Sequence, residues 1–144
     1  MAKRNYQNNY VSVTQCLSAL RKVGLEQWFL SNTRAFCNAE SSKGKLIGTL
    51  IHQGIEDFTE GRKVKIETEY SGEIMNALNG FMIFRKEHPE IIFEKAEAAL
   101  TSEKYQYNGT IDSKSSENNK SVVVDYKTGK TKKGELVCYP EYLA

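Results

Sequence analysis

Two stretches of the chain decide its fold, Tyr107-Asn-Gly-Thr-Ile-Asp112 and Val122-Val-Val-Asp125-Tyr-Lys127-Thr-Gly129. The second stretch is rich in β-branched residues, which favour strands. The polar residues between the two include Asn118-Asn119, and asparagine tolerates the positive φ angles of a tight turn. The sequence therefore predicts a β-hairpin, and a turn centred on the two asparagines would place Asp112 directly opposite Asp125.

The predicted hairpin carries two acids that repel each other. Opposed side chains on antiparallel strands have Cβ atoms only ~5 Å apart, and like charges at that spacing destabilise a sheet. A divalent cation such as Mg²⁺ or Mn²⁺ would compensate, because carboxylate oxygens are the ligands that these ions prefer. Lys127 points the same way as Asp125, since residues i and i+2 of a strand share a face. Two simpler arrangements remain open: a solvated face that bears both aspartates, or a bulge that breaks the register.

A third strand precedes the hairpin in the sequence. Ile91–Leu100 reads as a strand, and a turn near Lys104-Tyr105 joins it to the hairpin, which predicts a three-stranded meander. This turn would bring Glu97 beside Asp112 as a third carboxylate. Glu94 has the opposite parity, so Glu94 and Glu97 can face the site together only if a bulge intervenes.

Helices are predicted through most of residues 11–89. A first short helix is expected after Thr14 as its N-cap, with Gly24 as its stop signal. A second is expected around Leu25–Leu30, and the sequence does not place its end. Trp28 in this second helix is expected in the core rather than as a stacking platform.

The best helical periodicities lie over Lys45–Glu60 and over Ser71–His88, which Pro89 closes. His52 lies at the margin of the first apolar stripe, one turn after Gly48, where it can look toward a site at the edge of the core. A hydrogen-bonded structural histidine and a metal ligand both fit this position. The predicted inward-facing residues are Ile47, Leu50, Ile51, Ile55 and Phe58 in the first helix, and Ile74, Met75, Leu78, Phe81 and Met82 in the second, with Phe84 as a further candidate.

The chain is strongly basic after the hairpin, with four lysines among residues 127–133. These side chains could contact a phosphate backbone just beyond the acidic site, and a solvated loop is the alternative. Further on, Pro140 reads as the first turn of a helix. The candidate phosphate contacts are Thr128, Lys130, Lys132 and Lys133.

Length and composition fit one globular domain. The 144 residues are 40% hydrophobic and 26% charged, with a net charge of +2, so any basic surface must be local. We expect one domain over 1–144, made of a polar arm at 1–10, a mainly helical part at 11–89, a three-stranded sheet with the site at 90–129, and a basic loop with the start of a helix at 130–144.

The cysteines and the hydropathy pattern bear on the compartment. Cys16, Cys37 and Cys138 show no metal-type spacing and leave one thiol unpaired in any disulfide scheme, which favours a reducing cytosol. The start of the sequence lacks the apolar run of a signal peptide, and no apolar run is long enough for a membrane span.

These residues together resemble the RecB-type branch of the PD-(D/E)XK nuclease superfamily. Gly48-Thr-Leu-Ile-His52-Gln-Gly-Ile-Glu56 looks like the G-x-x-x-H-x-x-I-E segment of that branch, and Asp125-Tyr-Lys-Thr-Gly129 looks like its signature D-Y-K-T-G. Ser12-Val-Thr14 with Gly24-Leu-Glu-Gln-Trp28 is similar to the N-terminal part of phage-encoded members and of the mitochondrial genome maintenance exonuclease. The resemblance covers nearly the whole chain, from about residue 11 onward.

The resemblance implies an α+β fold with a restriction-endonuclease-like α/β core. N-terminal helices would pack on a small mixed or antiparallel sheet that carries the active-site hairpin, and the C-terminal part would be truncated. It also implies a hydrolase, a Mg²⁺- or Mn²⁺-dependent deoxyribonuclease that acts as an exonuclease on single-stranded DNA or free ends. The expected setting is DNA repair or recombination in the cytoplasm of a bacterial or phage-infected cell.

The resemblance assigns a role to each candidate residue. Asp112 and Asp125 would be the principal metal ligands, with Glu97 and His52 completing or orienting the site. The metal would lower the pKa of bound water and neutralise charge on the scissile phosphate. Lys127 would hold or polarise the attacking water and offset the charge that builds up in the transition state.

Two departures from the family pattern leave alternatives. Members usually carry a Gln-x-x-x-Tyr segment on the helix after the third strand, and this chain reaches only Tyr142-Leu-Ala144 there. Members with an iron–sulfur cluster need four cysteines, and the three of this chain argue against such a cluster. Because the C-terminal motif is missing, the main alternative is a catalytically incompetent nuclease-fold module that binds DNA or a replication or recombination partner. A third, weaker alternative is an α+β protein with a coincidental acidic hairpin.

Overall fold

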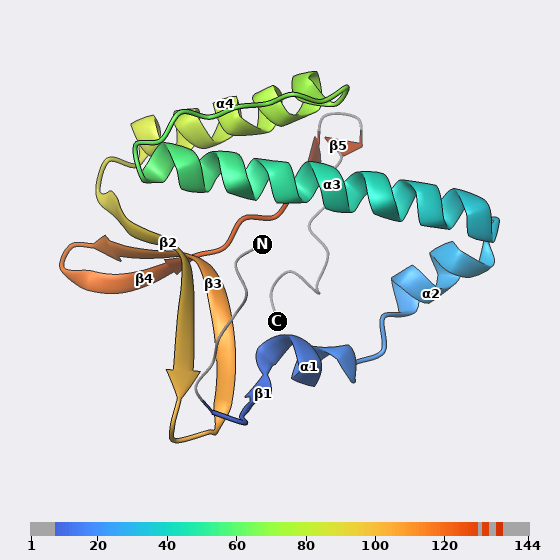
Figure 1. Ribbon diagram of the computed structural model, residues 1–144, viewed down its shortest axis with the longest axis horizontal. Coiled ribbons are helices and arrows are strands. Elements are labelled where there is room, and N and C mark those ends of the chain that lie inside the picture. The colour runs from blue at the N-terminus through green and yellow to red at the C-terminus, as the bar shows by residue number, and fades with distance from the viewer. Residues whose placement is uncertain (1–7, 130, 133–134, 137–144) are drawn as a thin grey trace.

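The computed structural model describes residues 8–129, 131–132 and 135–136 (Figure 1). Within these residues the chain is mixed α/β, with four helices, one four-stranded mixed sheet and one two-stranded sheet. The order along the chain is β1 (Val11–Ser12), α1 (Val13–Ser18), α2 (Val23–Leu30), α3 (Arg34–Thr59), α4 (Ser71–Glu87), β2 (Ile91–Ser102), β3 (Tyr107–Glu117), β4 (Lys120–Val124), β5 (Thr131–Lys132) and β6 (Glu135–Leu136).

The predicted hairpin is present with the predicted register. β3 and β4 are antiparallel and pair from Ser113 with Val124 to Glu117 with Lys120. Asn118-Asn119 forms the turn, with φ angles of 49° and 63°, the left-handed values that a two-residue turn of this kind needs. The choice of asparagine at both positions therefore fixes which residues of the two strands face each other.

The meander before the hairpin is also confirmed. β2 and β3 pair antiparallel from Ser102 with Tyr107 to Ile91 with Glu117, and the register shifts once, between Phe93 and Lys95. The structure adds β1, which pairs in parallel with the start of β3. Since β2 occupies one edge of β3 throughout, β1 and β4 share the other edge.

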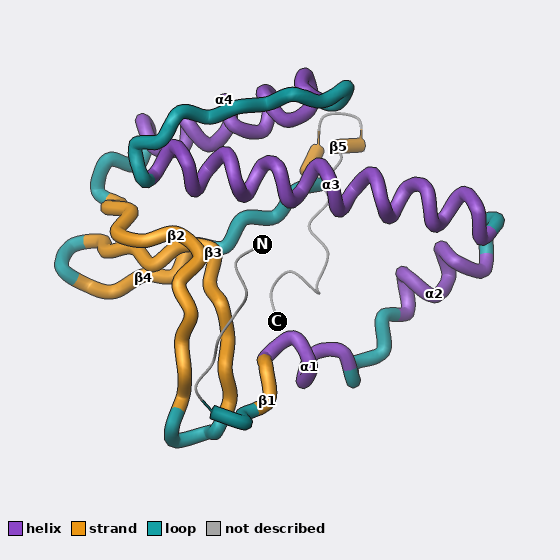
Figure 2. Tube along the Cα trace, in the orientation of Figure 1, coloured by secondary structure: helices purple, strands orange, loops and turns teal. Residues whose placement is uncertain are grey.

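The core lies where α3 and α4 meet the sheet. Both helices lie side by side above the sheet in Figures 1 and 2. Phe81 of α4 makes edge-to-face contacts with Phe93 of β2, at 5.4 Å between ring centroids, and with Tyr126 after β4, at 5.5 Å. These contacts hold the meander against the helices. The buried cluster itself is Ile51, Ile55, Ile74, Leu78 and Phe81.

The second long helix has the predicted bounds but only part of the predicted buried face. α4 ends at Glu87 with His88 as its C-cap, and Ile74, Leu78 and Phe81 are buried. The prediction that Met75 and Met82 fill the core is wrong, because they are 47% and 42% exposed. The buried face of α4 is therefore narrower than the sequence pattern predicts.

The helix that bears His52 begins eleven residues before the predicted start, at Arg34 instead of Lys45. The Thr33 side chain caps it by accepting a hydrogen bond from the Phe36 amide, at 3.3 Å. Residues 34–44 are largely polar or small, so they lack the apolar stripe from which a helix is predicted.

The N-terminal helices differ from prediction in their ends. Ser12, not Thr14, is the N-cap of α1, and it forms a reciprocal capping box with Gln15. Gly24 lies inside α2 and does not end the first helix, which stops at Ser18. Trp28 is not in the core: α2 has no buried residue, and the indole packs on Phe29 and Phe36.

Other expectations fall partly outside the described residues. Residues 1–7 of the polar arm, Cys138 and the helix expected from Pro140 all lie outside them. Cys16 is exposed and Cys37 buried, and both thiols are free. Among the described helices, none combines the length and apolar character needed to cross a membrane.

Candidate metal centre

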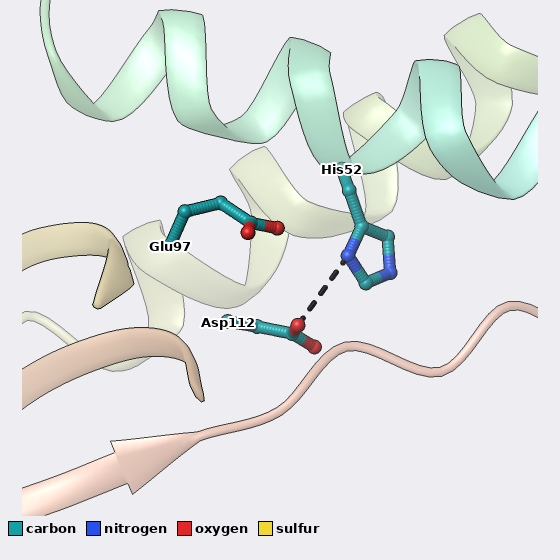
Figure 3. A group of neighbouring side chains, drawn as sticks. All are labelled: His52, Glu97 and Asp112. Carbon is teal, nitrogen blue, oxygen red and sulfur yellow. Dashed lines mark ion pairs between the residues drawn. The ribbon is translucent and has the colours of Figure 1, made fainter. Parts of the chain in front are cut away.

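Three of the predicted site residues come together, each from a different element. His52 projects from α3, Glu97 from β2 and Asp112 from β3, and Figure 3 shows the three side chains pointing toward one another. One ligand atom of each lies within 4.8 Å of those of the other two. This is the only group of three or more metal-ligating side chains found in the described part of the chain.

His52 reaches this position because of the packing of its helix. Ile51 and Ile55 turn into the core, which leaves His52 at the margin of the buried stripe, half-buried and facing the sheet. One turn earlier, Gly48 lies beside the loop after β4, and a Cβ built there would make an ordinary contact of 3.5 Å with the Thr128 hydroxyl oxygen. Figure 2 shows this loop running from the sheet toward α3.

Glu97 owes its direction to an unusual backbone conformation. Its φ is +48°, a left-handed value that non-glycine residues rarely adopt. Ala96 pairs with Ser113 and Ala98 with Ile111 on either side of it, so the ladder holds the distorted residue in place. Such strain persists only where the surrounding structure overrides it, and it is concentrated at functional sites.

Asp112 is held through both of its carboxylate oxygens. Oδ2 accepts a hydrogen bond of 2.7 Å from the Tyr126 amide, and Oδ1 lies 3.5 Å from Nδ1 of His52. Only 17% of the Asp112 side chain is exposed. The residue lies within β3 between the stretch that pairs with β1 and the stretch that pairs with β4.

The charges of the group shift its pKa values. The contact with the Asp112 carboxylate raises the pKa of His52 above its usual 6.5, against the opposing effect of burial. Burial alone would raise the pKa of Asp112, but hydrogen bonds from His52 and the Tyr126 amide, with the charges of His52 and Lys127, hold it below 3.8. Asp112 is therefore ionised at neutral pH, as a metal ligand must be.

Tyr126 is the site-supporting residue that sequence reasoning missed. Its amide binds Asp112, and its ring packs edge-to-face on His52, with 5.8 Å between the centroids. The ring also packs edge-to-face on Phe81 in the core, so Tyr126 connects the site to the core. Its burial raises the pKa of its phenol. The signal that could have found it is parity, since Tyr126 continues the alternation of Val122 and Val124 toward the helices.

Asp125 and Lys127 lie beside the group rather than in it. β4 ends at Val124, and it is the Tyr126 amide that meets Asp112, so the two aspartates do not share one site as the predicted register suggested. The Asp125 carboxylate instead forms an ion pair with Lys127, and both side chains are about half exposed. Lys127 remains close enough for its charge to lower the pKa of Asp112.

The remaining candidates are placed as follows. Glu94 forms an ion pair with Lys114, at 3.1 Å, so Glu97 and not Glu94 is the third member of the group. Thr128 lies next to α3 at Gly48. Lys132 contributes backbone to β5, and its side chain lies outside the described part, as do Lys130 and Lys133 entirely.

Comparison with known proteins assigns no family. No family model matches the chain, and neither a curated protein nor a solved structure matches it.

The donor set of the group suits a hard divalent cation. Two carboxylates and one imidazole offer oxygen and nitrogen ligands, the carboxylates being the type preferred by Mg²⁺ and Mn²⁺. Metal ligands in proteins are oriented by hydrogen bonds from neighbouring groups, and the Tyr126 amide makes such a bond to Asp112. The residues present therefore fit such an ion.

Proposed function

We propose that this protein is a metal-dependent deoxyribonuclease of the RecB-type PD-(D/E)XK class, acting as an exonuclease on single strands or free ends. The observation that carries the proposal is the convergence of His52, Glu97 and Asp112 from three elements, with the Lys127 charge close enough to affect Asp112. The restriction-endonuclease-like assignment of the mixed α/β fold is part of the same proposal.

Each side chain has a part in phosphodiester hydrolysis under this proposal. His52, Glu97 and Asp112 would hold Mg²⁺ or Mn²⁺, which when bound would lower the pKa of water and offset phosphate charge. Lys127 would place its ammonium near the scissile phosphate and stabilise the growing negative charge. Asp125 would direct that ammonium through their ion pair, or would join the metal after releasing Lys127.

The test is cleavage of end-labelled single- and double-stranded DNA with Mg²⁺ or Mn²⁺. We expect Asp112→Asn and Glu97→Gln each to lower the rate by at least ~10²-fold, because each removes a charged ligand. The control is Glu94→Gln, a carboxylate on the same strand that pairs with Lys114 outside the group. Equal cleavage by the parent and Asp112→Asn would end the proposal.

Mn²⁺ binding, followed by electron paramagnetic resonance, separates the two roles of Asp125. If Asp125 only directs Lys127, Asp125→Asn should slow cleavage but bind Mn²⁺ as the parent does. If it joins the metal, binding should weaken as well.

One observation favours a second candidate, a nuclease-fold module that binds DNA, or a replication or recombination partner, without cutting it. Lys127 is held by Asp125, and Asp125 lies outside the ligand group, so the two signature residues are engaged with each other. Salt-dependent DNA binding by a parent protein that never cleaves would support this candidate.

A further inference from the structure

Two tyrosines stack at the far end of the strand that carries Asp112. The rings of Tyr105 and Tyr107 are 6.4 Å apart between centroids and inclined by only 15°. Lys104 holds its ammonium 4.9 Å from the centroid of the Tyr105 ring. Tyr105 is 65% exposed and Tyr107 38% exposed, so neither ring contributes much to the core. Figure 1 shows the β2–β3 turn at the end of the sheet away from α3 and α4.

The backbone that carries these rings is held by strand pairing and a turn hydrogen bond. Tyr107 pairs with Ser102 on one edge and with Val11 of β1 on the other. The Tyr105 amide donates to the Ser102 hydroxyl, at 3.3 Å, and Gln106 between the tyrosines takes a left-handed φ of 53° that turns the chain. The turn therefore brings the two tyrosines onto a defined stretch of backbone, where their rings stack.

We propose that Tyr105 and Tyr107 form a stacking platform for unpaired bases of single-stranded DNA, with Lys104 contacting the phosphate beside them. The inference rests on the proposed nuclease function, since it assigns a place where the substrate strand is held. Flat, exposed aromatic rings with a neighbouring cation are the means by which proteins bind single strands without reading sequence, because every base has a π-face. The Lys104 ammonium covers the face of the Tyr105 ring on which a base would stack. When a base displaces this ammonium, Lys104 can contact the phosphate beside it.

The position of the platform relates it to the metal centre. Tyr107 lies five residues from Asp112 on β3, a separation of at most roughly 17 Å along a strand. A few nucleotides of an extended strand cover that span. Tyr107 and Asp112 have opposite parity on β3, so their side chains start from opposite faces of the strand, and Val13 of α1 lies over Gly109 on the Tyr107 face. A DNA strand stacked on the tyrosines would therefore pass around the edge of the sheet to reach the site.

The first test measures binding without cleavage. Fluorescence anisotropy of a labelled oligothymidylate in EDTA should show the Tyr105→Ala/Tyr107→Ala double variant binding at least ~10-fold more weakly than the parent, which corresponds to the loss of one stacked base. Tyr105→Phe should bind as the parent does, because it keeps the ring. Lys104→Ala should weaken binding and reduce its salt dependence, whereas Lys120→Ala at the other hairpin tip should not.

Thermal unfolding checks that the double variant is folded, and Lys104→Ala tests the site without altering either ring. The platform is overturned if the double variant binds the oligonucleotide as the parent does, if Tyr105→Phe binds as weakly as the double variant, or if the parent binds no single-stranded DNA.

Cleavage kinetics distinguish failure of the platform from failure of the nuclease proposal. With Mn²⁺, we expect the double variant to raise KM for a long single strand and to leave kcat unchanged, since the platform touches no reacting atom. A substrate too short to reach the turn should be cleaved equally by both proteins. A parent that cleaves, together with a double variant of unchanged KM, overturns the platform alone; a parent that binds through the tyrosines but never cleaves overturns only the nuclease proposal.

Discussion

At the scale of single residues, the His52–Asp112 pair is where charge, burial and backbone contacts meet. Asp112 raises the pKa of His52, and His52 helps to lower the pKa of Asp112. A raised pKa means that the folded state binds the proton more tightly than the unfolded state, so the pair stabilises the metal-free protein while His52 is charged. That contribution is fully present below pH 6.5, the usual value for histidine, and is lost as the pH rises through the raised value.

This predicts a pH dependence of the metal-free protein. In EDTA, the difference in unfolding free energy between the parent and His52→Gln should be largest below pH 6.5 and should shrink as the pH rises through the raised pKa of His52. His88→Gln is the control, because His88 is the other histidine of the chain and pairs with Glu90 on the surface. Nuclear magnetic resonance titration of the two imidazoles gives the direct measurement. A His52 that titrates at or below 6.5 would contradict the prediction.

The backbone conformation that directs the Glu97 carboxylate into the site is unfavourable for a non-glycine residue. A non-glycine residue in the left-handed region costs about 1 kcal/mol or more, whereas glycine adopts it freely. We therefore expect Glu97→Gly to raise the free energy of unfolding by about 1 kcal/mol relative to Glu97→Ala, as measured by urea denaturation. Both variants lack the carboxylate, so the comparison isolates the φ of +48°. Equal stability of the two would mean that the conformation carries no strain.

At the scale of elements, the sequence predicted what local chemistry dictates and missed what distant contacts decide. Both turns of the meander were placed correctly, because Asn118-Asn119 and the polar segment near Lys104 are strong local signals, and each turn fixes a register. The start of α3 at Arg34 was missed because that part of the helix has no buried stripe.

The candidate site shows the same division. Register predicted the proximity of Glu97 and Asp112, and helical phase predicted the direction of His52. The spacing of residues could not reveal that β4 ends at Val124. Beyond that point the Asp125 carboxylate pairs with Lys127, and the Tyr126 amide donates a hydrogen bond to Asp112. The left-handed φ of Glu97 has no local signal either, because glutamate does not favour it.

At the scale of the whole molecule, α3 is the element on which the other parts depend. It packs against α4 through the buried cluster, contacts β2, and supplies His52 to the site. The close approach of α4 depends on Gly54, since a Cβ built there would lie 3.0 Å from both Leu78 methyl carbons. Leu78 is buried, so its side chain has little room to move away.

A matched pair of substitutions in α3 tests this packing. Gly44→Ala meets no atom within 4 Å and should stabilise the protein by about 0.5–1 kcal/mol, because alanine is the better helix former. Gly54→Ala gains the same helix propensity but overpacks the α3–α4 contact, which costs about 1–3 kcal/mol. We therefore expect urea denaturation to rank Gly54→Ala below the parent and Gly44→Ala above it. Equal gains in the two variants would show that Leu78 yields at no cost and that the glycine does not set the distance between the helices.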